Sequence, residues 1–249
     1  MSKFSNILTM ILVVLIVAII GVVGYFAYDT LNAKKVESNA LSAIDEFEKA
    51  TKQVKRKVPK NEDSNNNTVD ENQSGSSSSL DELVNKMENE SNTVSEETTD
   101  PNTETEDGEP EPVYYEGYEV KGTIEIPATK VNYPILNAIT KKSLEVAIGL
   151  VPYGPGINKE GNTILYGHNF RNGTFFSNNK KLKNGDEIII TDQRGEKVTY
   201  IIYNIYQTTS NDAEYMTRDT QGRREISLQT CTDDSKDRLI IWAAEKGSM

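Results

Sequence analysis

A long apolar run near the N-terminus is the feature that most constrains how this chain can fold. No charged residue occurs from Phe4 to Tyr28, and the stretch 7–28 is almost wholly apolar. As an α-helix rising about 1.5 Å per residue, such a run crosses a hydrocarbon layer about 30 Å thick. We therefore expect residues 1–30 to form a cytoplasmic N-terminus and a transmembrane anchor, with residues 7–28 in the lipid bilayer.

Two other interpretations of this run fit the sequence less well, and the charges beside the run do not decide its orientation in the membrane. A secretory signal has an apolar region of only about 7–15 residues, and no small-x-small cleavage site follows here. A buried core helix rarely has this length. Lys3 precedes the run while Lys34 and Lys35 follow it, so the positive-inside count does not favour an outside C-terminus.

The next segment, residues 31–60, has helical periodicity. Apolar residues and a threonine recur at spacings of three and four with charges between them: Leu41, Ile44, Phe47, Thr51, Val54 and Val58. This pattern predicts one amphipathic juxtamembrane helix that ends before Pro59. Its basic end could contact anionic headgroups, and a solvated helix without a partner fits the pattern equally well.

Most of the net charge of −11 belongs to residues 61–112. This segment has a balance of −15, whereas residues 1–60 carry +4 and residues 113–249 carry 0. It contains no aromatic residue and is rich in Asn, Ser, Thr and acidic side chains, so it cannot bury enough apolar area to offset its ordering entropy. We expect an acidic disordered linker that spaces the C-terminal unit from the bilayer. An acidic binding tail is the alternative.

The composition of residues 113–249 predicts a compact, mainly β domain. Runs rich in β-branched and aromatic residues predict strands at 118–126, 131–136, 163–166, 187–191, 197–207, 225–230 and 238–244. Short helices are expected at 143–148 and 175–181, and a turn at 211–216. Many short strands with few helices favour a closed barrel or a sandwich. The neutral charge of this unit argues against nucleic-acid binding.

The chain has one cysteine and one histidine, and both follow predicted strands. One cysteine excludes an intrachain disulfide, and one Cys with one His is too few for a zinc cluster. A cysteine nucleophile needs a partner imidazole, and acyl transfer needs a donor for the oxyanion. Cys231, His168 and Arg238 supply these three groups. From position alone, a buried small cysteine and a structural histidine stay the more common readings.

The motifs around these residues resemble those of the sortase family. Thr163-Ile-Leu-Tyr-Gly-His168-Asn169 is similar to the sortase histidine motif, and Ser227-Leu-Gln-Thr-Cys231 followed by Arg238 is similar to the cysteine and arginine motifs. Three further motifs occur in the family's order: Gly122 to Pro127, Asn132 to Leu136 and Asn172 to Phe176. The resemblance covers about residues 115–246. Ser227 departs from the threonine that usually opens the cysteine motif.

The resemblance implies a fold and a reaction. Residues 113–249 would form a closed eight-stranded β-barrel that cleaves an LPxTG-like sorting signal by cysteine transpeptidation. No cofactor is expected, and no pattern of carboxylates in the sequence assigns a metal site. Cys231 would attack the Thr carbonyl, His168 would transfer protons, and Arg238 would position the substrate and stabilise the oxyanion. Thr230, Asn169 and Tyr166 would contact the substrate.

The resemblance also implies partners and a location. Secreted proteins with a C-terminal sorting signal would be the substrates, and an amine of a peptidoglycan precursor would be the acceptor. The barrel would lie outside a Gram-positive type of cell, on a single-pass anchor. A cysteine protease that hydrolyses the acyl-enzyme and a catalytically inactive wall-associated module remain alternatives. The histidine loop is similar to class B sortases, while residues 144–156 look more like class D or E. The segments 192–195 and 206–223 would set substrate preference.

Overall fold

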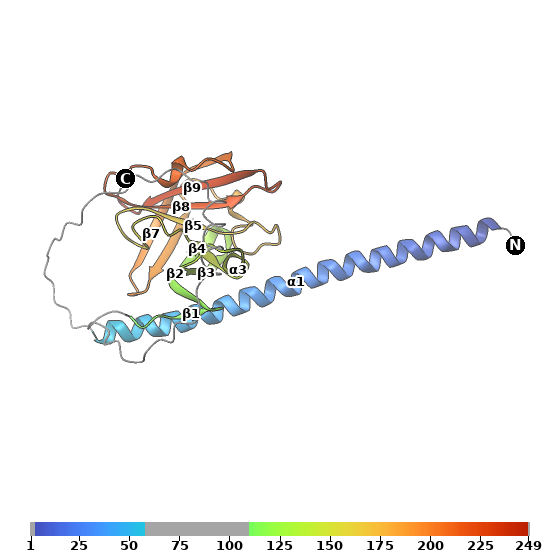
Figure 1. Cartoon of the computed structure of the whole chain (residues 1–249), viewed down its shortest axis with the longest axis horizontal. Helices are drawn as coiled ribbons and strands as arrows, with labels where there is room; N and C mark the ends of the chain where they lie inside the picture. The colour runs from blue at the N-terminus through green and yellow to red at the C-terminus, as the bar shows by residue number, and fades with distance from the viewer. Residues whose placement is uncertain (1–2, 58–109, 249) are drawn as a thin grey trace, which may run out of the picture.

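The computed structural model describes residues 3–57 and 110–248, and side chains from residue 8 to residue 52 within the N-terminal helix. The expected linker at 61–112 lies almost entirely outside the described residues. The described chain consists of a long N-terminal helix and a β-barrel that lies beside the second half of this helix (Figure 1).

The barrel is a single closed sheet. Its strands are β1 (Tyr114–Tyr115), β2 (Tyr118–Ile126), β3 (Val131–Leu136), β4 (Ile148–Leu150), β5 (Gly161–Tyr166), β6 (Glu187–Asp192), β7 (Lys197–Thr209), β8 (Arg224–Cys231) and β9 (Asp237–Glu245). Their order is β1-β2-β3-β4-β5-β8-β9-β7-β6, and pairing of β2 with β6 closes the ring. Because the two-residue β1 pairs only with β2, eight strands form the barrel.

The barrel is mixed, and this decides where the site lies. β3 and β4 are parallel, as are β5 and β8, and the other neighbours are antiparallel. The carboxyl ends of β5 and β8 therefore lie at the same edge of the sheet. The antiparallel β9 begins at this edge. The expected mainly β fold with a closed eight-stranded barrel is confirmed.

Each of the seven expected strands is present, while β1 and β4 were not expected. Two or three residues are too few to show the alternation on which strand prediction depends. β4 also contains Gly149, where a Cβ atom would lie 2.6 Å from the carbonyl oxygen of Ala138. A glycine at this crowded position weakens any strand signal.

The helical expectations were only partly right. The helix expected at 143–148 is α3 (Lys141–Leu144), which begins earlier because the Thr140 hydroxyl accepts a hydrogen bond from the Ser143 amide, 3.2 Å away. Residues 175–181 form turns that end in the 3₁₀ helix η2 (Asn179–Lys181). The other two 3₁₀ helices are η1 (Pro127–Thr129) and η3 (Glu214–Met216), and η3 lies in the expected turn.

The sheet formed by β5, β8 and β9 is buried on both faces. Inside the barrel, alternate residues such as Leu228 and Ile241 join the main core. On the outer face, Ile164 and Ile240 belong to a second apolar cluster, which Tyr215 from the connection between β7 and β8 covers. Burial on both faces agrees with the unbroken apolar run from Leu239 to Ala244 in β9, whereas β8 alternates Ile226 and Leu228 with polar residues that are also buried.

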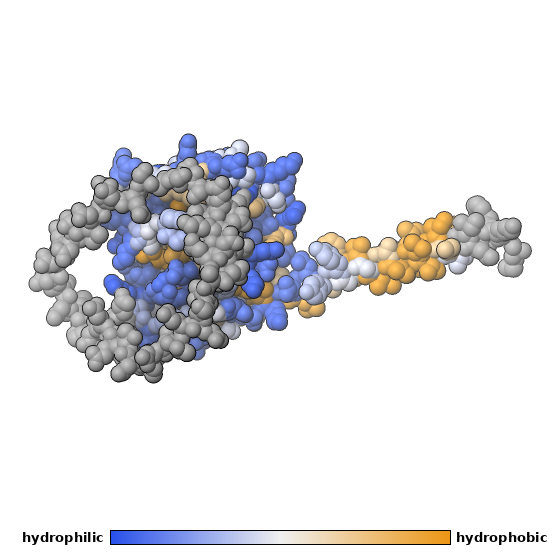
Figure 2. Space-filling view, viewed as in Figure 1, coloured by the Kyte–Doolittle hydropathy of each residue, from blue (hydrophilic) through white to orange (hydrophobic). Residues whose placement is uncertain are grey.

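Helix α1 (Lys3–Lys57) is continuous through the expected boundary at residue 30. Its N-terminal part is long and apolar enough to cross a membrane, and none of that part is buried in the protein. Figure 2 shows this apolar zone extending away from a mainly hydrophilic barrel surface. The described part of the helix runs to Lys57, and Pro59 lies outside the described residues.

The C-terminal half of α1 packs against β2 and β3 of the barrel. The buried stripe consists of Ala40, Ala43, Ile44, Phe47 and Thr51. Ala43 and Phe47 join an apolar cluster that includes Tyr115, Val120 and Leu136, and Ala40 joins the main barrel core. Leu41, expected on this stripe, is 45% exposed. Residues 40, 44, 47 and 51 share one face of a helix with 3.6 residues per turn, and residue 41 lies about 100° away from residue 40.

Candidate active site

Cys231 and Arg238 face each other across two neighbouring strands. Cys231 ends β8, Arg238 is the second residue of β9, and the two are direct partners in the antiparallel register. Side chains of directly opposed residues project from the same face of a sheet, with their Cβ atoms about 4.5–5.5 Å apart. Arg238 is only 5% exposed, and its Nη1 donates to the Asp237 carbonyl over 3.4 Å.

Strand β5 brings the histidine segment to the same edge. Tyr166, the last residue of β5, is paired with Gln229 of β8, and its hydroxyl lies 3.6 Å from the Cys231 sulfur. Gly167 continues the pairing through its amide, which donates to the Gln229 carbonyl over 3.1 Å. A Cβ atom at Gly167 would come within 2.6 Å of the Phe176 ring. The chain therefore needs glycine directly before His168.

His168 lies between two aromatic rings. Its ring centroid is 6.0 Å from that of Tyr166 and 4.6 Å from that of Phe170. Burial lowers the pKa of His168, and the nearby carboxylate of Glu145 only partly opposes this shift. Among residues 3–57 and 110–248, no hydrogen bond joins His168 to Cys231. A mainly neutral imidazole near pH 7 is suited to accept a proton.

Asn169 joins the histidine loop to the segment that follows Cys231. Its Nδ2 donates to the Cys231 carbonyl and to Asp233 Oδ1, each over 3.0 Å. Asp233 also pairs with Lys180 at 2.5 Å and accepts from Arg171 through its backbone carbonyl at 2.9 Å. The ammonium of Lys180, followed by the Asn169 amide, lowers the pKa of Asp233. This cluster fixes the two loops relative to each other.

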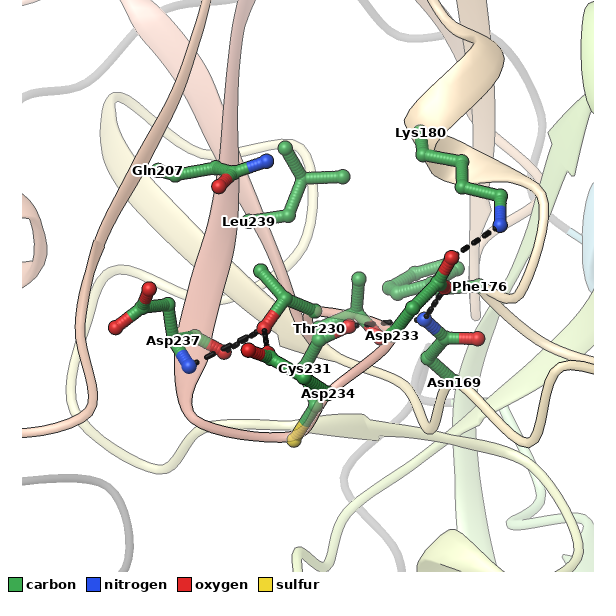
Figure 3. Close-up of a pocket in the computed structure, with 11 residues that line it drawn as sticks. Asn169, Phe176, Lys180, Gln207, Thr230, Cys231, Asp233, Asp234, Asp237 and Leu239 are labelled. Carbon is green, nitrogen blue, oxygen red and sulfur yellow. Dashed lines mark hydrogen bonds and ion pairs between the residues drawn. The ribbon is translucent and has the colours of Figure 1, made fainter.

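A cleft of about 320 Å³ adjoins Cys231 at the end of the barrel (Figure 3). Its lining comes from the ends of β7, β8 and β9 and from the loops beside them: Asn169, Phe176, Lys180, Gln207, Thr230, Cys231, Thr232, Asp233, Asp234, Asp237 and Leu239. Figure 3 shows the Cys231 sulfur directed away from Gln207 and Leu239. Neither His168 nor Arg238 lines this cleft. It therefore lies beside the face that Cys231 and Arg238 share.

Thr230 belongs to this cleft. It is 2% exposed, and its hydroxyl has no hydrogen-bond partner within the described part of the chain. Thr230 precedes Cys231 on the strand, so the two side chains point to opposite faces of the sheet. Its hydroxyl is therefore not on the face that Cys231 and Arg238 share.

The connection between β7 and β8 covers the outer face of the sheet next to Gln229, two residues before Cys231 on β8. Tyr215 is 2% exposed, and its hydroxyl donates to the side-chain carbonyl of Gln229, the next residue on the same face as Cys231. This residue was expected only as part of the broad segment 206–223. No local motif singles out Tyr215, because its position depends on how a turn folds back over the sheet.

A buried ion pair holds the far end of this connection. Arg218 pairs with Glu225, donates to the Tyr203 hydroxyl over 2.9 Å, and lies 4.7 Å above the Trp242 ring. Burial alone would raise the pKa of Glu225, but hydrogen bonds from Tyr203, Arg218 and Arg223 outweigh it and lower the pKa. The sequence gives no sign of this cluster, since its members come from separate segments.

The order and spacing of these elements agree with one protein family. The family model described as the sortase domain matches residues 124–246, which include β5, β8 and β9. The chain belongs to the sortase family. The family expected from the sequence motifs is thereby confirmed.

Individual relatives of this sortase are moderately similar. It is 31% identical over 126 residues to sortase A of Bacillus anthracis and 28% identical over 130 residues to sortase A of Streptococcus agalactiae. These matches cover 49% and 50% of this chain but only 58% and 52% of the relatives. Among solved structures, a Clostridium perfringens sortase D5 transpeptidase is 30% identical, with a TM-score of 0.47 over 51% of this chain and 79% of that one.

The structure brings together four of the six residues expected in the site. Cys231, Arg238 and Tyr166 share one face, and His168 follows Tyr166 after Gly167. Asn169 is occupied in joining loops, and Thr230 faces the neighbouring cleft. Within residues 3–57 and 110–248, no group of three His, Cys, Asp or Glu side chains could hold a metal ion.

Proposed function

We propose that this sortase is a membrane-anchored cysteine transpeptidase that uses Cys231, His168 and Arg238. The observation that carries the proposal is the register pair of Cys231 and Arg238, with the histidine segment on the adjoining parallel strand. A thiol, a neutral imidazole and a permanently charged guanidinium at one sheet edge form the minimum set for acyl transfer through a thioester.

In the first half-reaction, the Cys231 thiol transfers its proton to His168 and the thiolate attacks the carbonyl carbon of the scissile peptide bond. A C–S bond forms, and the carbonyl oxygen becomes an oxyanion that Arg238 stabilises. When the C–N bond breaks, His168 returns the proton to the leaving amine. The acyl part of the substrate is then held as a thioester on Cys231.

The second half-reaction reverses these proton transfers with a new amine. The incoming amine attacks the thioester, His168 accepts a proton from the amine nitrogen, and a second tetrahedral intermediate forms beside Arg238. Breaking the C–S bond creates an amide and a thiolate, which takes the proton back from His168. No electron acceptor is consumed, and one peptide bond is exchanged for another.

The substrates that we propose rest on family resemblance. They are secreted proteins whose C-terminal LPxTG-like signal is cleaved after Thr, with an amine of a peptidoglycan precursor as acceptor. The barrel would lie on the extracellular side, with the apolar part of α1 in the membrane. The apolar, unburied N-terminal part of α1 supports the membrane location.

Partitioning of the acyl-enzyme tests this function. The full chain in detergent is given an LPxTG-containing peptide with and without a small primary amine, and products are identified by mass spectrometry. We expect an amide product that grows with amine concentration, and none from Cys231→Ala. If the yield of the hydrolysis product does not depend on the amine concentration, the protein is a protease. Absence of any Cys231 adduct would favour an inactive interaction module.

A further inference from the structure

The position of α1 relative to the catalytic end of the barrel has a consequence for substrate choice. Asp29 directly follows the apolar run 7–28, and its Oδ1 accepts a hydrogen bond from Asn172 Nδ2 at 3.5 Å. Asn172 belongs to the histidine loop, three residues after Asn169. The loop that carries the expected proton-transfer residue therefore meets α1 where its apolar run ends.

Short links connect this contact to the nucleophile. Asn169 Nδ2 lies 3.0 Å from the Cys231 carbonyl oxygen. Because three residues span at most about 11 Å, Cys231 lies within roughly 25 Å of the end of the apolar run. In Figure 1 the C-terminus, just after β9, lies at the side of the barrel away from the N-terminal part of α1. The start of β9, which carries Arg238, is at the opposite side and faces the apolar part.

The buried stripe keeps this arrangement fixed. Ala40, Ile44 and Phe47 are at most 8% exposed against the barrel, and α1 is continuous from the apolar part to this stripe. A continuous helix transmits position along its axis at about 1.5 Å per residue. The height of the barrel above a membrane would then depend on the helix and not on the acidic segment 58–109.

We infer that α1 acts as a ruler that selects substrates by the distance between their scissile bond and the membrane. The inference rests on the proposed transpeptidase function for its substrate chemistry. With Cys231 within roughly 25 Å of the bilayer and about 3.4 Å per extended residue, the preferred substrates are polypeptides tethered in the same membrane by about seven residues. Substrates on long tethers sample this position less often.

The lone cysteine allows a test that needs no activity. Cys231 in the full chain is labelled with a fluorescent donor, the protein is placed in liposomes with acceptor-labelled headgroups, and energy transfer is measured. Seven helix-forming residues inserted after Leu31 add two turns while nearly keeping the face of the stripe. We expect Cys231 to move about 10 Å farther from the headgroups. The same insertion after Lys57, beyond the stripe, is the matched control and should move nothing.

Two outcomes would overturn the ruler: no movement after the insertion at Leu31, or equal movement after the insertion at Lys57. A second pair of variants tests the contact between α1 and the barrel without inserted residues, which could themselves shift the helix. Phe47→Glu should abolish the fixed distance and broaden the energy-transfer distribution. Leu41→Glu, at an exposed position six residues before Phe47 in the same helix, should leave it unchanged. Equal behaviour of these two variants would also contradict the inference.

The functional consequence is measured with substrates that carry their own membrane segment. Tethers of about 3 to 30 residues separate this segment from the sorting sequence, and the optimum should shift by about three residues when the insertion after Leu31 adds about 10 Å. A water-soluble peptide in detergent should react equally with all variants. If that peptide fails even with the unaltered protein, the proposed function fails. If it reacts but the optimum does not shift, the ruler fails.

Discussion

At the scale of single residues, the catalytic set depends on strand register. Arg238 is held in place by its pairing with Cys231 and is nearly fully buried. The motifs predict Cys231, His168 and Arg238 as catalytic residues, because each occurs in a recognisable run of residues, and their roles stay a prediction. They could not predict that Asn169 bridges two loops, because this depends on tertiary contacts, whereas the position of Thr230 on the face opposite Cys231 follows from the alternation of side chains along a strand.

Replacing Arg238 by Lys tests the need for guanidinium geometry. A lysine keeps the positive charge but loses the planar set of donors, so we expect kcat to fall about 10²–10³-fold, as when an oxyanion donor is lost. Steady-state transpeptidation with peptide and amine provides the measurement. Arg224→Lys, in an exposed ion pair with Glu196, is the control and should stay near normal. Turnover close to that of the unaltered enzyme in Arg238→Lys would argue against an oxyanion role.

The lowered pKa of His168 predicts how stability changes with pH. Burial makes the folded chain bind this proton less readily than the unfolded chain, whose histidine has a pKa of about 6.5. The folded state therefore keeps its full stability above about pH 6.5 and loses some as pH falls below it, until the folded pKa is reached. Urea unfolding from about pH 7.5 to 5.5 should show this slope.

The matched variant for this prediction is His168→Gln, which cannot titrate in this range. Its free energy of unfolding should depend less on pH over the same interval. Because the carboxylates titrate mainly at lower pH, they contribute little to the difference between the two proteins. An identical slope in both proteins would mean that the imidazole has the same pKa in the folded and unfolded chains.

At the scale of elements, the strands were predictable and their connections were not. β7 is long and rich in β-branched residues, β8 alternates apolar and polar residues, and β9 contains an unbroken apolar run, so composition and pattern locate them. The segment 175–181 is expected to form a short helix. It forms turns instead, because Phe175 and Phe176 are buried in the barrel core and Phe175 adopts a φ of 48°. Tertiary packing here overrides a local preference.

The connection between β7 and β8 offers a test of element-level stability. Arg218→Met keeps an apolar side chain near Trp242 but removes the guanidinium from the fully buried Glu225. Breaking one side of a buried pair costs about 3–5 kcal/mol. Because Arg223 and Tyr203 still contact Glu225, we expect a loss near the lower end of this range. Urea unfolding of the full chain measures this change in the free energy of unfolding of the barrel.

A double-mutant cycle separates the ion pair from simple packing. Adding Glu225→Gln to Arg218→Met removes the unpaired charge, so the double variant should lose less stability than the two single changes would together. Arg224→Met, next in sequence to Glu225 but in an exposed pair with Glu196, should change stability by less than about 1 kcal/mol. Strict additivity of the first two changes would show that they act independently.

At the scale of the whole molecule, α1 is one continuous helix, and the barrel packs against its C-terminal half. The sequence predicted an amphipathic helix over residues 31–60 but left its partner open. The missing information was the complementary surface, which is formed by β2 and β3 with Tyr115 and Leu136. Alanines at positions 40 and 43 give a weak hydrophobic signal, yet their small size allows close approach to the barrel.

Phe47→Ala should release this half of α1 from the barrel. Phe47 is 2% exposed in the contact, and truncating a buried phenylalanine costs about 3–5 kcal/mol. A helix separated from its partner is only marginally stable in water, so the amides of residues 40–51 should exchange with solvent much faster. Leu41→Ala removes an exposed apolar side chain six residues before Phe47 in the same helix and should leave exchange almost unchanged. Hydrogen exchange of the full chain in detergent makes this comparison, with the amides of β8 and β9 as an internal reference.

Those strands form the core sheet, so they should remain protected in both variants if α1 detaches alone. Loss of protection across β8 and β9 in Phe47→Ala would instead mean that α1 and the barrel unfold as one cooperative unit.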